Sequence, residues 1–209
     1  MKILSVLMIL VALTGCGSNK GSGSNGITTL IGYGDSITYG AYNNHISFID
    51  LISHALNYHP VNKAISGTSM FSANQYDLLM SDSFNSTDII FFTPGINDAG
   101  YYGNDPAYVA QYQSALEDIL NRIHSLGIKA YIGTPIQVLQ EVGPMTNANI
   151  ALYAEINRKV VQNQNDPNIV LVDFNTGYSP VGGNDWSDGI HPVSQGYQAM
   201  TQFFLMNYR

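Results

Sequence analysis

The sequence is poor in cysteine and in positive charge, and each shortage excludes classes of protein. Cys16 is the only cysteine among 209 residues, so the chain forms no internal disulfide, no CxxC redox pair and no multi-cysteine metal site. Lysine and arginine total 8 against 15 aspartates and glutamates, which gives a formal net charge of −7. A chain without a basic surface cannot displace counterions from phosphates, so no nucleic acid is expected as a partner.

The N-terminus lacks a hydrophobic run of membrane-spanning length. Lys2 precedes the apolar or small stretch Ile3–Leu13, which is shorter than the ~20 residues that a transmembrane helix needs and is typical of a signal-peptide core. The stretch ends in Leu-Thr-Gly-Cys at Cys16 and resembles the lipobox of bacterial lipoproteins, in which the cysteine is lipidated and becomes the new N-terminus. The alternatives are an ordinary secretory signal or a buried strand whose cysteine is incidental.

The lipobox resemblance implies a signal peptide over residues 1–15 and a lipidated Cys16, followed by a tether up to residue 26. Gly17–Gly26 contains only Gly, Ser, Asn and Lys20, a composition that behaves as a flexible coil. A lipoprotein cysteine carries several acyl chains, which gives stable membrane anchoring. We therefore expect an exported bacterial cell-envelope lipoprotein. Gly17 in place of an aspartate predicts the outer membrane if the host has two membranes.

The rest of the sequence is typical of a folded protein. Hydrophobic residues make up 45% of the chain and aromatic residues 11%, which is too apolar for a disordered chain. At ~100–200 residues per domain, the length allows one full domain. No internal repeat and no second boundary interrupts residues 27–209, so this range is expected to be a single domain.

Short apolar runs alternate with helix-period stretches from Thr28 onward, a pattern that predicts βαβ units and a parallel sheet. The expected strands are Thr28–Tyr33, Val61–Ile65, Asp88–Thr93, Lys129–Thr134 and Asn168–Phe174. The clearest helix has Asp105 as its N-cap, Pro106 in its first turn and Gly127 at its end. Further helices are expected at His45–Tyr58, Asn149–Asn163 and Pro192–Tyr208.

A candidate nucleophile follows the first expected strand. Gly34, Asp35 and Ser36 form a turn that would expose a serine hydroxyl at the start of a helix. Such a hydroxyl needs an adjacent base to attack a carbonyl carbon. Near the C-terminus, Asp188 and His191 stand three residues apart, which lets the carboxylate orient the imidazole. The alternative hydrolase signature G-x-S-x-G is found at none of the serines, which disfavours the usual α/β-hydrolase elbow.

Two segments offer donors for an oxyanion, which acyl transfer also requires. Gly67 follows the second expected strand and can present its backbone N–H without a side chain blocking the approach. Asn97 follows the third strand in Gly-Ile-Asn-Asp, and its carboxamide can donate a hydrogen bond. Ser36, Gly67 and Asn97 each come just past the carboxyl end of a strand, where open α/β sheets bind ligands.

The ordered set GDS, then a glycine, then GxND and finally DxxH resembles the SGNH hydrolases, also called the GDSL family of esterases and lipases. The resemblance covers essentially all of Thr28–Arg209, although Ile37 stands where the family name has leucine. It implies an α/β fold, a three-layer α/β/α sandwich with a five-stranded, mostly parallel, flavodoxin-like sheet. It also implies Ser36 as nucleophile, His191 as general base and Asp188 as the group orienting it. The oxyanion hole would comprise the N–H groups of Ser36 and Gly67 and the Asn97 side chain.

The remaining polar residues suggest no further chemistry. Asp35 and Asp98 are interpreted as scaffold groups that hydrogen-bond the loops, and Asp185 is the near competitor of Asp188. The other histidines have no metal-ligand spacing and are expected in surface or packing roles: His45, His54, His59 and His124. No phosphate-binding glycine motif occurs, so neither a metal nor another cofactor is expected.

The leading hypothesis is a lipid-anchored serine esterase acting on an acylated carbohydrate, a lysophospholipid or a small acyl ester, with no protein partner implied. An acyltransferase with the same residues and a noncatalytic envelope-binding lipoprotein remain as alternatives. The expected substrate-pocket residues are Met70, Phe71, Tyr101, Tyr102 and Trp186. The segment Gln137–Asn149 could add a lid or pocket wall through Val138, Leu139, Val142 and Met145, although packing is the favoured role.

Overall fold

The computed structural model describes residues 27–72, 75–178 and 187–208. Five strands form one sheet in the order β2-β1-β3-β4-β5, and every neighbouring pair is parallel. The strands are β1 (Thr29–Gly34), β2 (His59–Asn62), β3 (Asp88–Thr93), β4 (Lys129–Gly133) and β5 (Ile169–Val172). This confirms the expected flavodoxin-like α/β fold. The expected signal peptide, Cys16, the tether, Asp185 and Trp186 lie outside the described residues.

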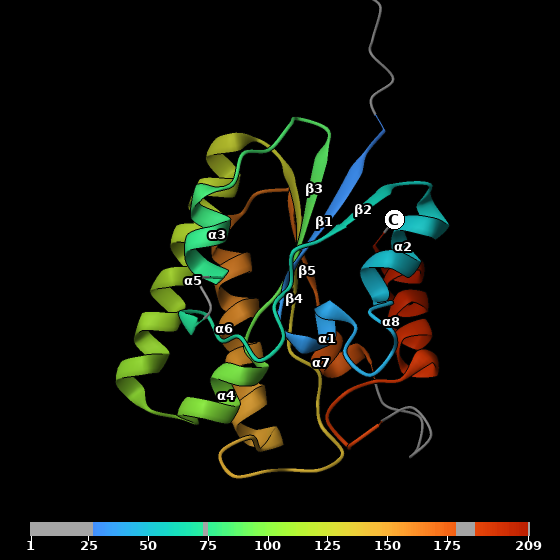
Figure 1. Ribbon diagram of the computed structural model, residues 1–209. Helices are drawn as coiled ribbons and strands as arrows, with labels where there is room; N and C mark the ends of the chain where they lie inside the picture. Colours follow the sequence, from blue (N-terminus) through green and yellow to red (C-terminus); the bar gives the residue numbers. More distant parts are fainter. Residues whose placement is uncertain (1–26, 73–74, 179–186, 209) are drawn as a thin grey trace, which may run out of the picture.

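Helices cover both faces of the sheet (Figure 1). On one face lie α2 (Phe48–Leu56) and α8 (Ser194–Asn207), which pack against each other, and on the other lie α3 (Gln75–Ser81), α5 (Pro106–Leu126) and α6 (Asn147–Gln164). Three short helices lie towards the carboxyl ends of the strands: α1 (Ser36–Tyr39), α4 (Ile96–Tyr102) and α7 (Phe174–Gly177). Within the described ranges, no helix has the length and apolar character needed to cross a membrane.

The two helical layers explain why the interior of β3, Ile89–Phe92, is apolar. All six of its residues are buried, because it is the central strand and helices cover both of its faces. Phe91 lies against Phe48 of α2 and Phe204 of α8, with ring centroids 5.1 and 5.5 Å apart. This aromatic cluster fills the space between the sheet and the α2–α8 layer.

The longest helix, α5, begins and ends where its capping residues predict. The Asp105 carboxylate accepts hydrogen bonds from the N–H groups of Ala107 and Tyr108, both 2.9 Å long, and Pro106 occupies the first turn. Gly127 closes the helix with a φ of 64°, a left-handed conformation that glycine adopts without penalty. The helix expected after Asp105 is therefore confirmed at both ends.

Other boundaries differ from the sequence expectation. The second strand was expected at Val61–Ile65 but is β2, His59–Asn62. Pro60 is tolerated because β2 is an edge strand. The strand ends at Asn62, whose carboxamide oxygen accepts the N–H of Ala64. The fifth strand stops at Val172, before the expected Phe174, because Asp173 starts α7. The remaining expected helices are confirmed as α2, α6 and α8 with ends shifted by one to three residues.

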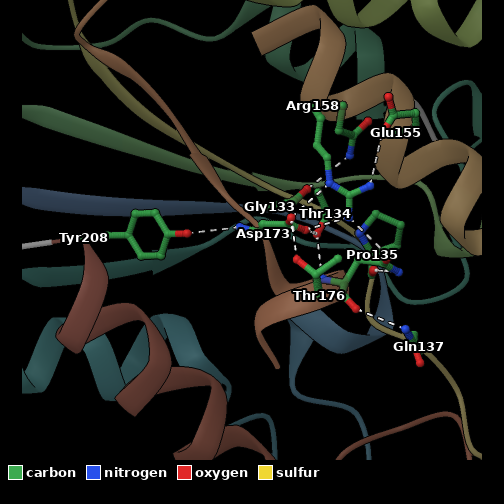
Figure 2. A network of polar contacts seen from close by, with 11 residues as sticks. Gly133, Thr134, Pro135, Gln137, Glu155, Arg158, Asp173, Thr176 and Tyr208 are labelled. Atoms are coloured by element: carbon green, nitrogen blue, oxygen red, sulfur yellow. Dashed lines mark hydrogen bonds and ion pairs between the residues drawn. The ribbon is translucent and has the colours of Figure 1, made fainter. Parts of the chain in front are cut away.

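A polar network fastens the carboxyl ends of β4 and β5 to α6 (Figure 2). Arg158 donates from Nε and Nη2 to the two carboxylate oxygens of Asp173, both at 2.9 Å, and Thr134 and Thr176 donate to the same carboxylate. Burial opposes ionisation of Asp173, but these hydrogen bonds outweigh it and lower the pKa of the carboxyl group. The network therefore fixes the positions at which the chain leaves β4 and β5.

Candidate active site

Ser36 stands at the turn between β1 and α1. Gly34 has a φ of 149°, and a Cβ there would lie 2.5 Å from Thr38 Oγ1, so the turn needs glycine. Asp35 caps α1 by accepting the N–H of Ile37 at 2.9 Å, which places Ser36 as the first helical residue. A backbone N–H in the first turn of a helix has no partner within the helix, so that of Ser36 is available to an anion.

Ser36, His191 and Asp188 form one hydrogen-bonded chain. Ser36 Oγ lies 2.8 Å from His191 Nε2, across 155 positions of sequence, and His191 Nδ1 lies 2.7 Å from Asp188 Oδ2. Asp188 Oδ1 also accepts the N–H groups of Ile190 and His191. Burial opposes ionisation of Asp188, but the hydrogen bonds from His191 and Ile190 outweigh it and hold the pKa of Asp188 below its usual value. A charged carboxylate therefore fixes the orientation of the imidazole.

The loop that carries Asp188 and His191 is hydrogen-bonded to the loop between β4 and α6, residues 134–146. The carbonyl oxygen of Gly189 accepts the N–H of Leu139 at 2.8 Å and that of Gln140 at 3.2 Å. Gly189 has a φ of 80°, and a Cβ there would lie 2.6 Å from Gln140 Cβ. Asn147 pins this loop in turn, because its side chain bonds both the N–H and the carbonyl of Val138. Packing was the favoured role for the apolar side chains of this segment: Val138 is buried and Met145 packs on the core, whereas Leu139 and Val142 are exposed.

Gly67, on the loop after β2, and Asn97, in α4, lie on neighbouring segments. The loop after β2 joins the end of β1 through the N–H of Ile65, which donates to Gly34 O at 2.9 Å. Gly67 has a φ of 78°, and the nearest atom to a Cβ there would be the Tyr101 hydroxyl at 3.7 Å. Asn97, in the first turn of α4, donates from Nδ2 to the carbonyl of Thr68 at 2.8 Å. This bond ties the α4 turn to the Gly67 loop.

Two buried carboxyl groups flank these residues and act as scaffold, as the sequence predicted. Asp98 accepts the N–H of Met70 at 2.9 Å and the hydroxyl of Tyr108 at 2.7 Å, while Asp35 caps α1. Burial raises the pKa of Asp35 to about 7 and that of Asp98 to about 6. Both side chains are buried, and their oxygens accept hydrogen bonds from the surrounding chain.

The expected pocket residues divide into two groups. Met70 and Val138 belong to the hydrophobic core and Met145 packs against it, so these three do not form an open pocket wall. Exposed residues are Phe71, Tyr101, Tyr102, Leu139 and Val142. Of these, Tyr101 is tied to a candidate oxyanion donor, because its hydroxyl donates to Gly67 O at 3.0 Å.

One residue near His191 was missed at the sequence level. The ring of Tyr42 lies with its centroid 4.9 Å from that of the His191 imidazole. Its only signal in the sequence is an aromatic residue six positions after Ser36. The contact depends on the unusual backbone of the loop after α1, which a sequence pattern does not predict.

Metal ligands do not gather in the described part of the chain. Among residues 27–72, 75–178 and 187–208, no group of three or more His, Cys, Asp and Glu side chains could hold a metal ion. His124 instead pairs with Asp166 at 2.7 Å, and the His45 ring lies against Tyr39.

Comparison with known proteins places the chain in a family. The sequence model of the GDSL-like lipase/acylhydrolase family matches residues 33–199. No curated protein matches the sequence of the chain.

Several solved structures share the fold. A lipolytic protein of the G-D-S-L family from Desulfitobacterium hafniense superposes with a TM-score of 0.68 at 18% identity, over 84% of this chain and 97% of the other. A G-D-S-L family protein from Veillonella parvula gives 0.67 at 20% identity, over 86% and 97%. The acetylxylan esterase Axe2 from Geobacillus stearothermophilus gives 0.65 at 19% identity, over 86% and 93%. At these identities the likeness shows the fold.

Proposed function

Since the chain belongs to the GDSL-like lipase/acylhydrolase family and is an ester-hydrolysing enzyme, we propose that it cleaves carboxylic esters through an acyl-enzyme on Ser36. The observation that carries this proposal is the chain of hydrogen bonds from Ser36 Oγ through the imidazole of His191 to Asp188, with lengths of 2.8 and 2.7 Å. A serine, a base and a group that orients the base are the parts that acyl transfer requires.

Each residue has a distinct role in this mechanism. Ser36 Oγ attacks the ester carbonyl carbon while His191 Nε2 takes its proton. The protonated imidazole then donates that proton to the alcohol oxygen as the C–O bond breaks, which leaves the acyl group on Ser36. Water attacks the acyl-enzyme with the same base and releases the acid. Asp188 stabilises the imidazolium in both halves because its own pKa is low.

The oxyanion of each tetrahedral intermediate needs fixed donors. We assign this role to the N–H groups of Ser36 and Gly67 and to the Asn97 carboxamide. The bond from Asn97 to Thr68 O and the open approach to Gly67 support the assignment. Donors held in place before the reaction cost no reorganisation as the charge develops.

The test of this mechanism is substitution of Ser36 and His191. Ser36→Ala and His191→Ala should each abolish hydrolysis of an acetyl ester, since nucleophile and base act as one unit. A fluorophosphonate probe should label the wild-type protein and leave Ser36→Ala unlabelled. Circular dichroism checks that the fold is retained. Near-normal turnover by a folded Ser36→Ala variant would refute the serine mechanism.

The substrate proposal is an acylated carbohydrate, a lysophospholipid or a small acyl ester. One structural relative is an acetylxylan esterase, which supports the carbohydrate ester. A panel of esters with increasing acyl chain length, set beside acetylated oligosaccharides, separates the three classes. Activity that rises with chain length would favour the lysophospholipid, and activity confined to acetyl groups on sugars would favour the carbohydrate.

The location of the enzyme is a further part of the proposal. The lipobox-like sequence ending at Cys16 supports a lipid-anchored lipoprotein of the bacterial envelope, in the outer membrane where the host has two. Mass spectrometry of the mature N-terminus should show an acylated Cys16, and Cys16→Ser should block acylation. An unmodified Cys16 in the mature protein would refute the anchor and leave the hydrolase proposal standing.

A further inference from the structure

The loop after α1 has an unusual backbone. Tyr42, Asn44 and His45 have φ values of 61°, 50° and 62°, in the left-handed region that non-glycine residues rarely occupy. The loop is closed on itself, because the N–H groups of Asn43 and His45 both donate to Gly40 O and the Asn43 side chain donates to Ile46 O at 2.6 Å. Its conformation is therefore held in place by local hydrogen bonds.

This loop brings Tyr42 against His191. The two rings lie 4.9 Å apart between centroids at an angle of 43°, yet 68% of the Tyr42 residue surface is exposed. One part of the ring thus contacts the imidazole while the rest faces solvent. A tyrosine is unfavourable in a left-handed conformation, and residues held in this way gather at functional sites. Because the Tyr42 ring is mostly exposed, its packing contributes little free energy to offset the backbone strain.

The proton transfer by His191 determines whether the acyl or the alcohol half of the ester lies beside the Tyr42 ring. His191 Nε2 takes the Ser36 proton and must pass it to the alcohol oxygen when the C–O bond breaks. The alcohol half must therefore lie next to the imidazole, while the carbonyl oxygen points to the proposed donors on Gly67 and Asn97. The ring beside His191 is placed to touch the alcohol.

We propose that Tyr42 determines specificity for the alcohol part of the ester, its exposed ring forming a wall for a ring-shaped alcohol. The inference rests on the proposed serine mechanism and deepens it. A flat aromatic ring makes its largest contact area with an alcohol that is itself a ring, such as a sugar or cyclohexyl ring. Carbohydrate esters fit this wall better than esters of short open-chain alcohols.

The proposal has a kinetic signature. During acylation the alcohol is present, because the Ser36 Oγ–carbon bond forms and the carbon–alcohol bond breaks in that half. During deacylation the alcohol has departed and water attacks in its place. Tyr42 should therefore affect acylation and leave deacylation unchanged, a split that a merely structural residue would not show.

The experiment compares Tyr42→Gly and Tyr42→Phe with wild type on two acetyl esters, cyclohexylmethyl acetate and ethyl acetate. Tyr42→Gly removes the ring and suits the left-handed backbone, so folding is not at risk. It should lower kcat/KM for the cyclohexylmethyl ester by about 3- to 10-fold, the effect of one aromatic contact, and change the ethyl ester less than about 2-fold. Tyr42→Phe should behave as wild type. The steady rate after a p-nitrophenyl acetate burst, which measures deacylation, should stay constant.

Asn44→Gly is the matched control, because it makes the same backbone change in the same loop and removes no ring; it should change neither ester. An equal loss on both esters, no loss on either, or a slower deacylation would overturn the proposal for Tyr42. Measuring Ser36→Ala in the same assays separates failure of the serine mechanism from failure of the Tyr42 inference. If Ser36→Ala retained activity the serine mechanism itself would fail, whereas Ser36-dependent hydrolysis with indifferent Tyr42 variants would overturn this inference alone.

Discussion

The carboxamide of Asn97 has two N–H bonds, and the structure uses one of them to hold Thr68 O. The second is the one proposed to meet the oxyanion. Asn97→Ala should lower kcat for an acetyl ester by about 10²- to 10³-fold with little change in KM, because the bond strengthens mainly as the charge develops. Steady-state kinetics measures this, and circular dichroism checks that the variant is folded. A change in KM alone would place Asn97 in ground-state binding.

Asp35 should make the stability of the fold depend on pH. Burial raises its pKa to about 7 in the folded state, against 3.8 for the free group. Between these values the folded state holds a proton that the unfolded state has lost, so stability falls as pH rises from about 4 to about 7. Asp35→Asn keeps an acceptor for the N–H of Ile37 and removes the ionisation. Its melting temperature should match wild type near pH 4 and exceed it increasingly towards pH 8, while parallel curves would contradict this reasoning.

At the scale of elements, the contact between the 134–146 loop and Gly189 should matter to activity. Gly189→Ala places a methyl group 2.6 Å from Gln140 Cβ and must displace the loop that carries Asp188 and His191. Misplacement by about 1 Å can cost about 10²-fold in rate, so kcat/KM should fall by at least about 10-fold. Gly143→Ala is the control: it has a similar φ of 56° and nothing within 4 Å of its Cβ. Equal activity of the two variants would rule out this positioning role.

Elements with strong local signals were predicted from the sequence, and those without were not. β3 was predicted at both ends because its interior is a continuous apolar run, as expected of a strand buried on both faces, and α5 because Asp105, Pro106 and Gly127 mark its ends. The helices α1, α3, α4 and α7 are too short to show a period, and bounds were predicted for none of them, although a helix was expected to start at Ser36. β2 was shifted because its residues lie at the edge of the sheet and two of them are exposed.

The same division applies to the candidate site. Ser36, Asp188 and His191 could be named because each stands in a motif of side chains, and the structure places them within hydrogen-bond distance, although their roles stay predictions. Gln140 and Tyr42 could not be named. The first acts through its main-chain N–H, which every residue except proline carries. The second depends on a left-handed backbone at a residue type that rarely adopts it.

For the molecule as a whole, folding and catalysis should need only residues 27–209. The first strand begins at Thr29, and all proposed site residues lie after it. A variant starting at Ile27 should therefore match the full mature protein in melting temperature and in kcat/KM for a dissolved acetyl ester. The comparison is made in detergent, so that both forms are in solution. A lower melting temperature would show that the preceding segment packs on the domain.

The direction of β1 also decides which way the enzyme faces. The chain enters the sheet at the amino end of β1, and Ser36 follows its carboxyl end, at the opposite pole of the domain (Figure 1). The six residues of β1 separate the two poles by about 20 Å, at about 3.3 Å per residue. A flexible tether over Gly17–Gly26 would add about 17 Å on average. With the tether extended from the membrane, an enzyme anchored at Cys16 would hold its catalytic pole farther from the bilayer than the point where the chain enters the domain, within reach of esters on polymers or solutes of the surrounding envelope.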